Sequence, residues 1–237
     1  MFQVALNRAL AVQLCERGLM SENLIVTISR QMGSGGSEIG YRLAKSLGIR
    51  YIDREILTQT ARILEEKEQV LADRLERVSG LWEVVADCFS IGSPETSYAP
   101  PPLRFISDTR LFEVKSMVIR EIANNCSAVI IGHAGFHVLR DHPCVINIFI
   151  HAEPSIRARG VMDQYSVPTF EEARDMIQDS DRERRKLVNK VTGREWSDAL
   201  NFHLCLDSGT GGQDLAFEVA RRFIEGTSGC LPARSEG

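Results

Sequence analysis

This sequence lacks long apolar runs, an excess of basic residues and closely paired cysteines. No apolar stretch approaches the ~18 residues of a membrane-spanning helix, so we expect no transmembrane segment and no membrane partner. Its 28 Lys and Arg are outnumbered by 32 Asp and Glu, which gives a net charge of −4 and a pI near 5.8. This balance argues against nucleic acid as a partner, but a local basic cluster could still bind a small anion.

The six cysteines are scattered, with no C-x-x-C pair, at positions 15, 88, 126, 144, 205 and 230. Several lie in or beside apolar strand-like segments, so we predict reduced core thiols in a cytoplasmic protein. The first twenty residues have no continuous apolar core. We therefore expect a helical extension over residues 1–22 rather than a signal peptide.

Five short apolar segments alternate with helical patterns along a chain of 237 residues, a length that suits one domain. The predicted strands are Leu24–Ser29, Arg50–Asp53, Ala128–Ile131, Cys144–Ile150 and His203–Asp207. Strands this apolar, separated by helices, predict an α/β fold with a parallel sheet covered on both faces. We place the last helix at Asp214–Glu225 and expect the tail, residues 227–237, to fray.

A glycine-rich turn follows the first predicted strand and precedes a helical pattern. Backbone N–H groups in such a turn, with the positive end of the helix dipole, can bind phosphate oxygens. The residues that would do so are Gly33, Ser34, Gly35, Gly36 and Ser37. When the turn is aligned with the P-loop signature G-x-x-x-x-G-K-[ST], Arg30 occupies the position of the first glycine and Gly36 occupies the position of the lysine. Ser37 retains the hydroxyl that holds Mg²⁺, and we predict that Arg30 supplies the missing charge.

A second candidate feature is a basic cluster late in the chain. Six of its eight charged positions are basic, in the set Asp181, Arg182, Arg184, Arg185, Lys186, Lys190 and Arg194, with Glu183 between them. Most charge runs are solvated helix faces. We favour a functional interpretation here because guanidinium groups stabilise charge on phosphoryl oxygens, and Arg157 lies shortly after the fourth predicted strand.

Other candidate residues follow strand ends, where open parallel sheets bind ligands. Gly132 and His133 follow the third predicted strand, and Asp53 ends the second. His133 could equally be a structural histidine. Asp53 could contact a base or Mg²⁺, or cap the next helix.

Taken in order, these segments resemble the cytidylate kinase-like family, a branch of the P-loop nucleoside monophosphate kinases. The resemblance is carried by Ile28–Ser37, Tyr51–Ile56, Val129–Ala134, Phe149–Ala152, Asp181–Arg184, Thr192–Trp196 and Leu204–Ser208. It covers residues 23–226 and implies a P-loop kinase fold, three-layer α/β/α with a central five-stranded parallel sheet. It also implies an acceptor-binding insertion at 56–110, which includes a proline-rich loop, and a lid region at 157–196.

The resemblance implies transfer of the γ-phosphoryl group of ATP, with Mg²⁺, to a monophosphate acceptor such as CMP. By position, Arg157 and Arg184 would clamp the transferring group and Asp181 would orient the lid. Two departures keep alternatives open: Gly132-His133-Ala134 replaces an acceptor-reading Gly-Arg-Asp, and the loop lysine is absent. The chain is then either a nucleotide kinase or a degenerate nucleotide-binding sensor. A third alternative is an interaction protein that binds no ligand. The sequence is also compatible with a homo-oligomer.

Overall fold

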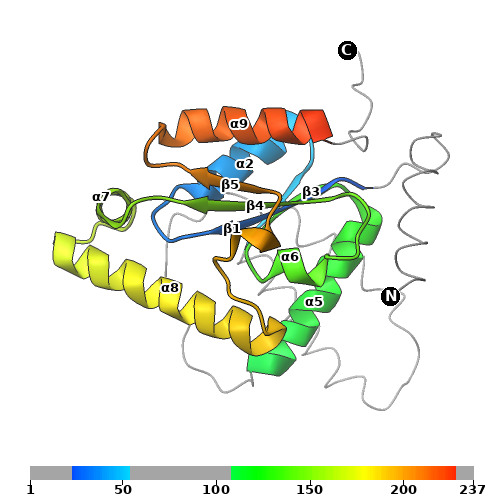
Figure 1. Cartoon of the computed structure of the whole chain (residues 1–237), viewed down its shortest axis with the longest axis horizontal. Coiled ribbons are helices and arrows are strands. Elements are labelled where there is room, and N and C mark those ends of the chain that lie inside the picture. The colour runs from blue at the N-terminus through cyan, green and yellow to red at the C-terminus, as the bar shows by residue number, and fades with distance from the viewer. Residues whose placement is uncertain (1–22, 54–107, 228–237) are drawn as a thin grey trace.

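A five-stranded parallel sheet lies at the centre of the protein, whose computed structural model describes residues 23–53 and 108–227 (Figure 1). The strand order is β2-β3-β1-β4-β5. The strands are β1 (Ile25–Arg30), β2 (Arg50–Ile52), β3 (Ala128–Ile131), β4 (Val145–His151) and β5 (Leu204–Asp207). Each predicted strand is therefore present, to within one residue at its ends.

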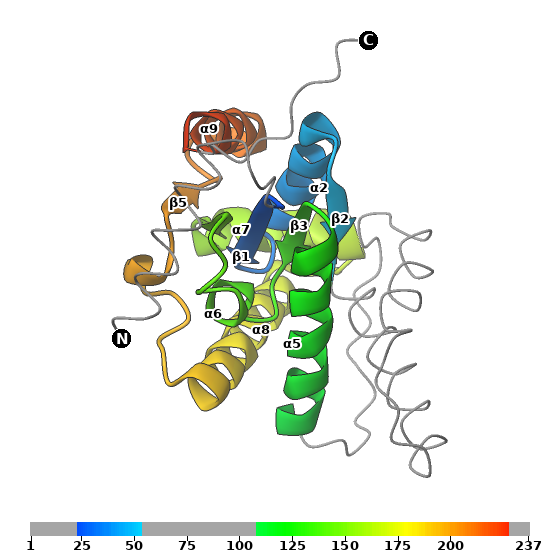
Figure 2. The same ribbon diagram turned by 90° about the vertical axis from the view of Figure 1, so that its right-hand side faces the viewer.

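Helices cover both faces of this sheet, as the view turned by 90° shows (Figure 2). Helices α2 (Gly36–Leu47) and α9 (Gly212–Thr227) lie on one face. The other carries α5 (Asp108–Asn125), α6 (Gly135–Val138) and α8 (Phe170–Thr192). Helix α7 (Pro154–Tyr165) lies beyond the carboxyl end of β4, and the 3₁₀ helix η2 (Ala199–Asn201) precedes β5. The predicted α/β/α architecture is confirmed.

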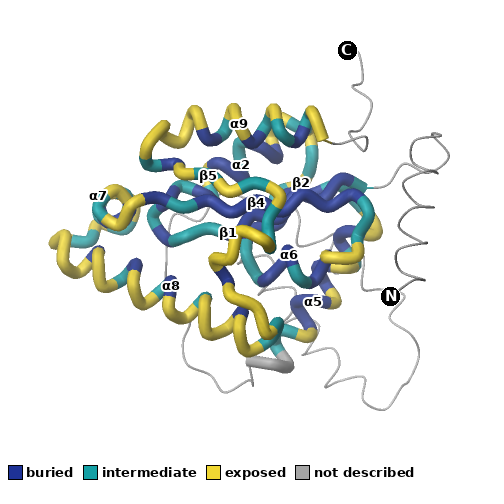
Figure 3. The backbone as a smooth tube through the Cα atoms, in the orientation of Figure 1, coloured by how far each residue is buried: buried dark blue, intermediate teal, exposed yellow. Residues whose placement is uncertain are grey.

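The alternation of side chains along each strand builds two separate apolar cores. In β1, Ile25 packs in the core formed with α5, whereas Val26 and Ile28 pack in the core formed with α2 and α9. The same alternation occurs in β3 between Ile130 and Ile131. Because both faces are covered, the central strands are buried along almost their whole length, as Figure 3 shows.

The sheet order places the glycine-rich turn at the point where the chain reverses direction across the sheet. The chain leaves β1 toward β2 and β3, then crosses back to β4 on the other side of β1. Ile28 pairs with Ile131 of β3 and with Ile148 of β4. Crevices at the carboxyl ends of strands beside such a switch point are where open α/β sheets bind ligands.

Three predictions from the sequence fall wholly or mostly outside the described residues. They are the helical extension at 1–22, almost all of the insertion at 56–110 and the tail at 227–237. The prediction of reduced thiols is wrong at Cys144, which is disulfide-bonded, while Cys126 and Cys205 are free. The sequence held no signal for that bond because no two cysteines have a recognisable spacing. Among the described residues, no helix is both long and apolar enough to cross a bilayer.

Candidate phosphate-binding site

Short hydrogen bonds tie the turn after β1 to β4 and close the turn on itself. The N–H of Gln31 donates to the carbonyl of Ile150 at 3.0 Å, and Ser34 Oγ donates to the carbonyl of Gln31 at 2.8 Å. Gly33 and Gly35 have φ angles of 77° and 71°, a region that L side chains rarely adopt. Glycine at these two positions is therefore what lets the chain turn tightly from the sheet into α2.

Helix α2 begins at this turn without a side-chain cap. Its N-cap residue, Gly35, offers no side chain, and the first hydrogen bond within the helix runs from the Ile39 N–H to the Gly35 carbonyl at 3.0 Å. In the described part of the chain, no acceptor takes the N–H groups of Gly36 and Ser37. Uncapped amides at the positive end of a helix dipole suit a phosphate.

The side chain of Arg30 lies over Gly36, the position of the P-loop lysine. A Cβ atom built on Gly36 would lie 2.5 Å from Arg30 Cβ and 3.0 Å from its Cγ. Arg30 Nε donates to Ser37 Oγ at 3.4 Å, and a Cβ on Gly132 would lie 2.5 Å from Arg30 Nη1. The guanidinium thus spans the space between the start of α2 and the carboxyl end of β3.

The outer side of the turn packs against the first two turns of α7. A Cβ on Gly33 would collide with the backbone carbonyl of Arg157, and a Cβ on Gly160 would lie 3.1 Å from the Gly33 carbonyl. Met32 is buried in the apolar cluster between α7 and α8, with Ala158 and Ile177 among its neighbours. The turn is therefore clamped between the sheet and the predicted lid region.

Three predicted residues meet behind this turn, at the buried carboxylate of Asp181. Arg157 Nη1 donates to Asp181 Oδ2 at 2.7 Å and to the Met32 carbonyl at 3.3 Å. Arg184 Nη1 approaches Asp181 Oδ1 at 3.4 Å, and the Met32 N–H makes a long contact of 3.5 Å with the same oxygen. The side chains of Arg157 and Asp181 are only 7% and 12% exposed, whereas that of Arg184 is 25% exposed.

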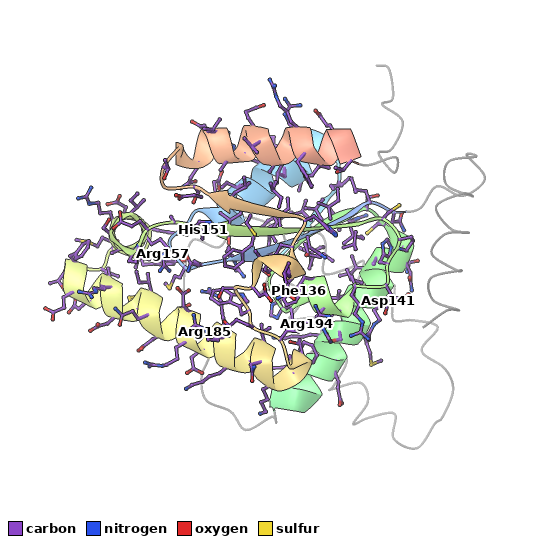
Figure 4. The ribbon with its side chains drawn as sticks, in the orientation of Figure 1. Phe136, Asp141, His151, Arg157, Arg185 and Arg194 are labelled. Atoms are coloured by element: carbon purple, nitrogen blue, oxygen red, sulfur yellow. The ribbon has the colours of Figure 1, made fainter. Side chains whose placement is uncertain are left out.

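Arg157 and Arg184 therefore differ in what they can do. Arg157 is held against Asp181 and the loop backbone, although its buried Nε has no hydrogen-bond partner among the described residues. Arg184 is partly open to solvent, with its guanidinium 6.0 Å from the Trp196 ring. Figure 4 shows Arg157 on α7, close to the end of β4 at His151. This arrangement suits Arg157 to holding the turn and Arg184 to meeting a ligand.

Most of the predicted basic cluster points away from the turn. Arg182 pairs with Asp179, Arg185 with Glu195 at 3.0 Å, and Lys186 with Glu183 at 3.1 Å, all on exposed surface. Such pairs contribute little to stability. The structure thus keeps Asp181 and Arg184 at the candidate site, and the remainder of the α8 cluster is largely a solvated helix face.

The turn after β3 faces the same edge of the sheet. Gly132, His133 and Ala134 have φ angles of 78°, 54° and 53°, so three successive residues are left-handed, two of them not glycine. Such backbone is uncommon and concentrates at functional sites. Gly132 contacts Arg30 as described above, and Asp53 is buried at the end of β2. The geometry places Gly132 beside the turn; the roles of His133 and Asp53 stay predictions.

The residues present fit Mg²⁺ only as a metal shared with phosphate. No group of three or more His, Cys, Asp or Glu that could hold a metal occurs in residues 23–53 and 108–227. Mg²⁺ on phosphates needs few protein ligands and keeps several waters. The Ser37 hydroxyl accepts one hydrogen bond from Arg30 and retains a second lone pair for a cation.

Two supports of the turn were missed by sequence reasoning. Ser208, buried directly after β5, donates its hydroxyl hydrogen to the Ser34 carbonyl at 2.7 Å, and its Oγ lies 3.1 Å from the His151 carbonyl oxygen. The Gln213 side chain of α9 lies where a Cβ on Gly35 would be. The position of Ser208 at a strand's carboxyl end was the available signal. For Gln213 the sequence held no such signal, because its contact with Gly35 depends on how α9 packs.

Comparison with known proteins identifies the family. The model of the cytidylate kinase-like family matches residues 25–210. The chain belongs to the cytidylate kinase-like family. This match spans β1, the glycine-rich turn, α8 and β5, and so confirms the P-loop kinase fold that the sequence predicted. Among proteins with curated descriptions, none matches the chain at a significant level.

Solved structures resemble this family member at low sequence identity. An uncharacterized protein from Eubacterium ventriosum ATCC 27560 has a TM-score of 0.63 and 21% identity, over 86% of this chain and 99% of that chain. Shikimate kinase from Bacteroides thetaiotaomicron has a TM-score of 0.44 and 12% identity, over 85% and 98%. Shikimate kinase from Acinetobacter baumannii in complex with shikimate has a TM-score of 0.43 and 12% identity, over 87% and 96%. The first likeness shows a shared fold and nothing more.

Substituting Gly33 with alanine should destabilise the protein by about 1–3 kcal/mol, because the new Cβ meets the Arg157 carbonyl and the backbone has a positive φ. The matched control is Gly226→Ala in α9, where a Cβ has nothing within 4 Å. Denaturant unfolding of both variants checks this expectation. Equal stability of the two would show that the turn is not held against α7.

Proposed function

We propose that the chain transfers the γ-phosphoryl group of ATP, with Mg²⁺, to a nucleoside monophosphate or a related small phosphate acceptor. The observation that supports this proposal is that the Arg30 side chain lies over Gly36, the position of the P-loop lysine, with its guanidinium beside Ser37 and Gly132. Phosphoryl transfer depends mainly on positioning and on stabilising negative charge. A guanidinium can do both for phosphoryl oxygens.

The other residues have distinct parts in this proposal. The amides of the turn and of the first turn of α2 would hold the ATP phosphates, and Ser37 would hold Mg²⁺, which neutralises developing charge when bound. Arg184 would contact the transferring group from α8. Arg157 and Asp181 would fix the turn in the shape that phosphate binding needs, with Arg157 Nε left as an unused donor.

On the acceptor side, Gly132, His133 and Asp53 would contribute from the carboxyl ends of β3 and β2. The left-handed backbone at Gly132–Ala134 supports this assignment, because it points to a turn shaped for more than connection. His133 occupies the position where cytidylate kinases carry an acceptor-reading arginine. The acceptor therefore need not be CMP.

Thermal unfolding with ATP–Mg²⁺, and then with a panel of nucleoside monophosphates and small phosphorylated acceptors, tests this function. We expect a rise in Tm with ATP–Mg²⁺ and ADP formation with at least one acceptor. A rise in Tm without ADP under any acceptor would instead identify a nucleotide sensor. No rise in Tm with any nucleotide would contradict both functions.

A further inference from the structure

A polar cavity lies on the α6 side of the sheet, away from the phosphate-binding turn. Its volume is about 160 Å³, and it is formed by α6, the start of β4 and the segment from Arg194 to His203. Val145 and Asn147 of β4, which line it, pair with the first half of β1, whereas the turn follows the last residue of β1. Figure 4 shows Phe136 of α6 and Arg194 together below η2.

The described lining of this cavity carries positive charge and no carboxylate. Its polar members are His137, Arg140, Asn147, Arg194, Asn201 and His203. Arginines and amides are donors, and they converge here from three separate segments of the chain. A cavity with this lining favours a ligand that brings negative charge and hydrogen-bond acceptors.

The charge on Arg194 is not neutralised within the described structure. Its Nη1 donates to the amide oxygen of Asn201 at 3.0 Å, and it pairs with no carboxylate among residues 23–53 and 108–227. Arg140 has one carboxylate neighbour, Asp141, at 3.3 Å, and both of these side chains are more than half exposed. An exposed pair of this kind is weak and leaves Arg140 able to bind another anion.

The environment of His137 also shows that positive charge dominates this cavity. Its Nε2 lies 3.3 Å from Arg140 Nη1, and because a guanidinium only donates, Nε2 accepts and Nδ1 carries the proton. That Nδ1 is buried and has no partner among the described residues. Burial lowers the pKa of His137, and the positive charges of Arg140, Arg194 and Arg120 lower it further. The ring therefore lies in a positive field.

We propose that this cavity is a binding site for a small oxyanion, namely inorganic phosphate or the phosphate group of a small phosphomonoester. The volume of about 160 Å³ is sufficient for one phosphate group. The site is separate from the phosphate-binding turn and does not depend on the function proposed for it.

Histidine C2-proton resonances of the full chain, followed by NMR during phosphate addition, test this proposal. The chain has five histidines, and His137→Gln identifies the resonance of interest. We expect that resonance to shift saturably with millimolar phosphate and the pKa of His137 to rise, because a bound anion favours the imidazolium. The double variant Arg140→Gln/Arg194→Gln should weaken this binding by about tenfold or more. Arg222→Gln, exposed on α9, should leave it unchanged.

Phosphate bound at the turn near Arg30 does not confuse this test, because the double variant leaves the turn intact. Tighter saturation by glycerol phosphate than by phosphate would assign the site to a phosphorylated metabolite, and the reverse order to free phosphate. A resonance that does not shift by 50 mM of either compound, or that shifts equally in the double variant, would overturn the proposal.

Discussion

Replacing Arg30 with alanine is expected to weaken the binding of ATP–Mg²⁺ by about 10- to 100-fold, the factor that the loss of one hydrogen bond between charged groups produces. The reason is that the Arg30 side chain lies over Gly36 and holds its guanidinium between the start of α2 and the end of β3. Titration calorimetry with ATP–Mg²⁺ measures the change in Kd.

Arg222→Ala is the matched control for this substitution. It also removes one arginine, but from the exposed surface of α9. We expect its Kd to equal that of the wild-type protein. If Arg30→Ala bound ATP–Mg²⁺ as tightly as this control, the missing lysine would not have been replaced by Arg30.

Removing the carboxylate of Asp181 is expected to destabilise the protein by about 3–5 kcal/mol, the usual cost of leaving a buried charge without its partner. Asp181→Ala would leave Arg157 buried, 7% exposed, against the Met32 carbonyl with no counter-ion. Because Arg157 also contacts the turn, the affinity for ATP–Mg²⁺ should fall as well. Urea unfolding measures the free energy of unfolding.

Asp179→Ala serves as control, since Asp179 lies two residues earlier on α8 in an exposed pair with Arg182. Its loss should change the free energy of unfolding by no more than about 0.5 kcal/mol. Equal destabilisation by both substitutions would mean that the Arg157–Asp181 pair is not the link between α7, α8 and the turn.

The fold could be predicted because the strand signals are local. Strand β4 has a run of β-branched and aromatic residues, and the first glycine after β1 is only three residues beyond its end, so each signal lies within a few positions of its strand. Helix α6 and η2 were not foreseen. They are four and three residues long, which is too short for helical periodicity to be visible.

From local patterns alone, the candidate site could be predicted only where it is continuous in sequence, and Arg157, Asp181 and Arg184 received their roles from the family resemblance. The turn at Arg30–Ser37 is such a case, and its position at the end of β1 was foreseen. The junction at Asp181 joins residues 149 positions apart, and nothing in the local pattern distinguishes Arg184 from Arg182 or Arg185. The difference depends on which side of α8 faces α7 and the turn. The contact between Arg30 and Gly36 likewise depends on side-chain direction.

That contact carries the central claim, that arginine at position 30 and glycine at position 36 are alternatives to the glycine and lysine of a P-loop. The most direct test is the Kd for ATP–Mg²⁺ of four proteins: wild type, Arg30→Gly, Gly36→Lys and the double variant, whose turn reads G-Q-M-G-S-G-K-S. Once Arg30 is glycine, the nearest remaining contact for a Cβ at position 36 is Ile150 Cβ at 3.4 Å, an ordinary distance. We predict that the double variant binds more tightly than either single variant. If the losses of binding free energy in the two single variants simply added in the double variant, residues 30 and 36 would not be such alternatives.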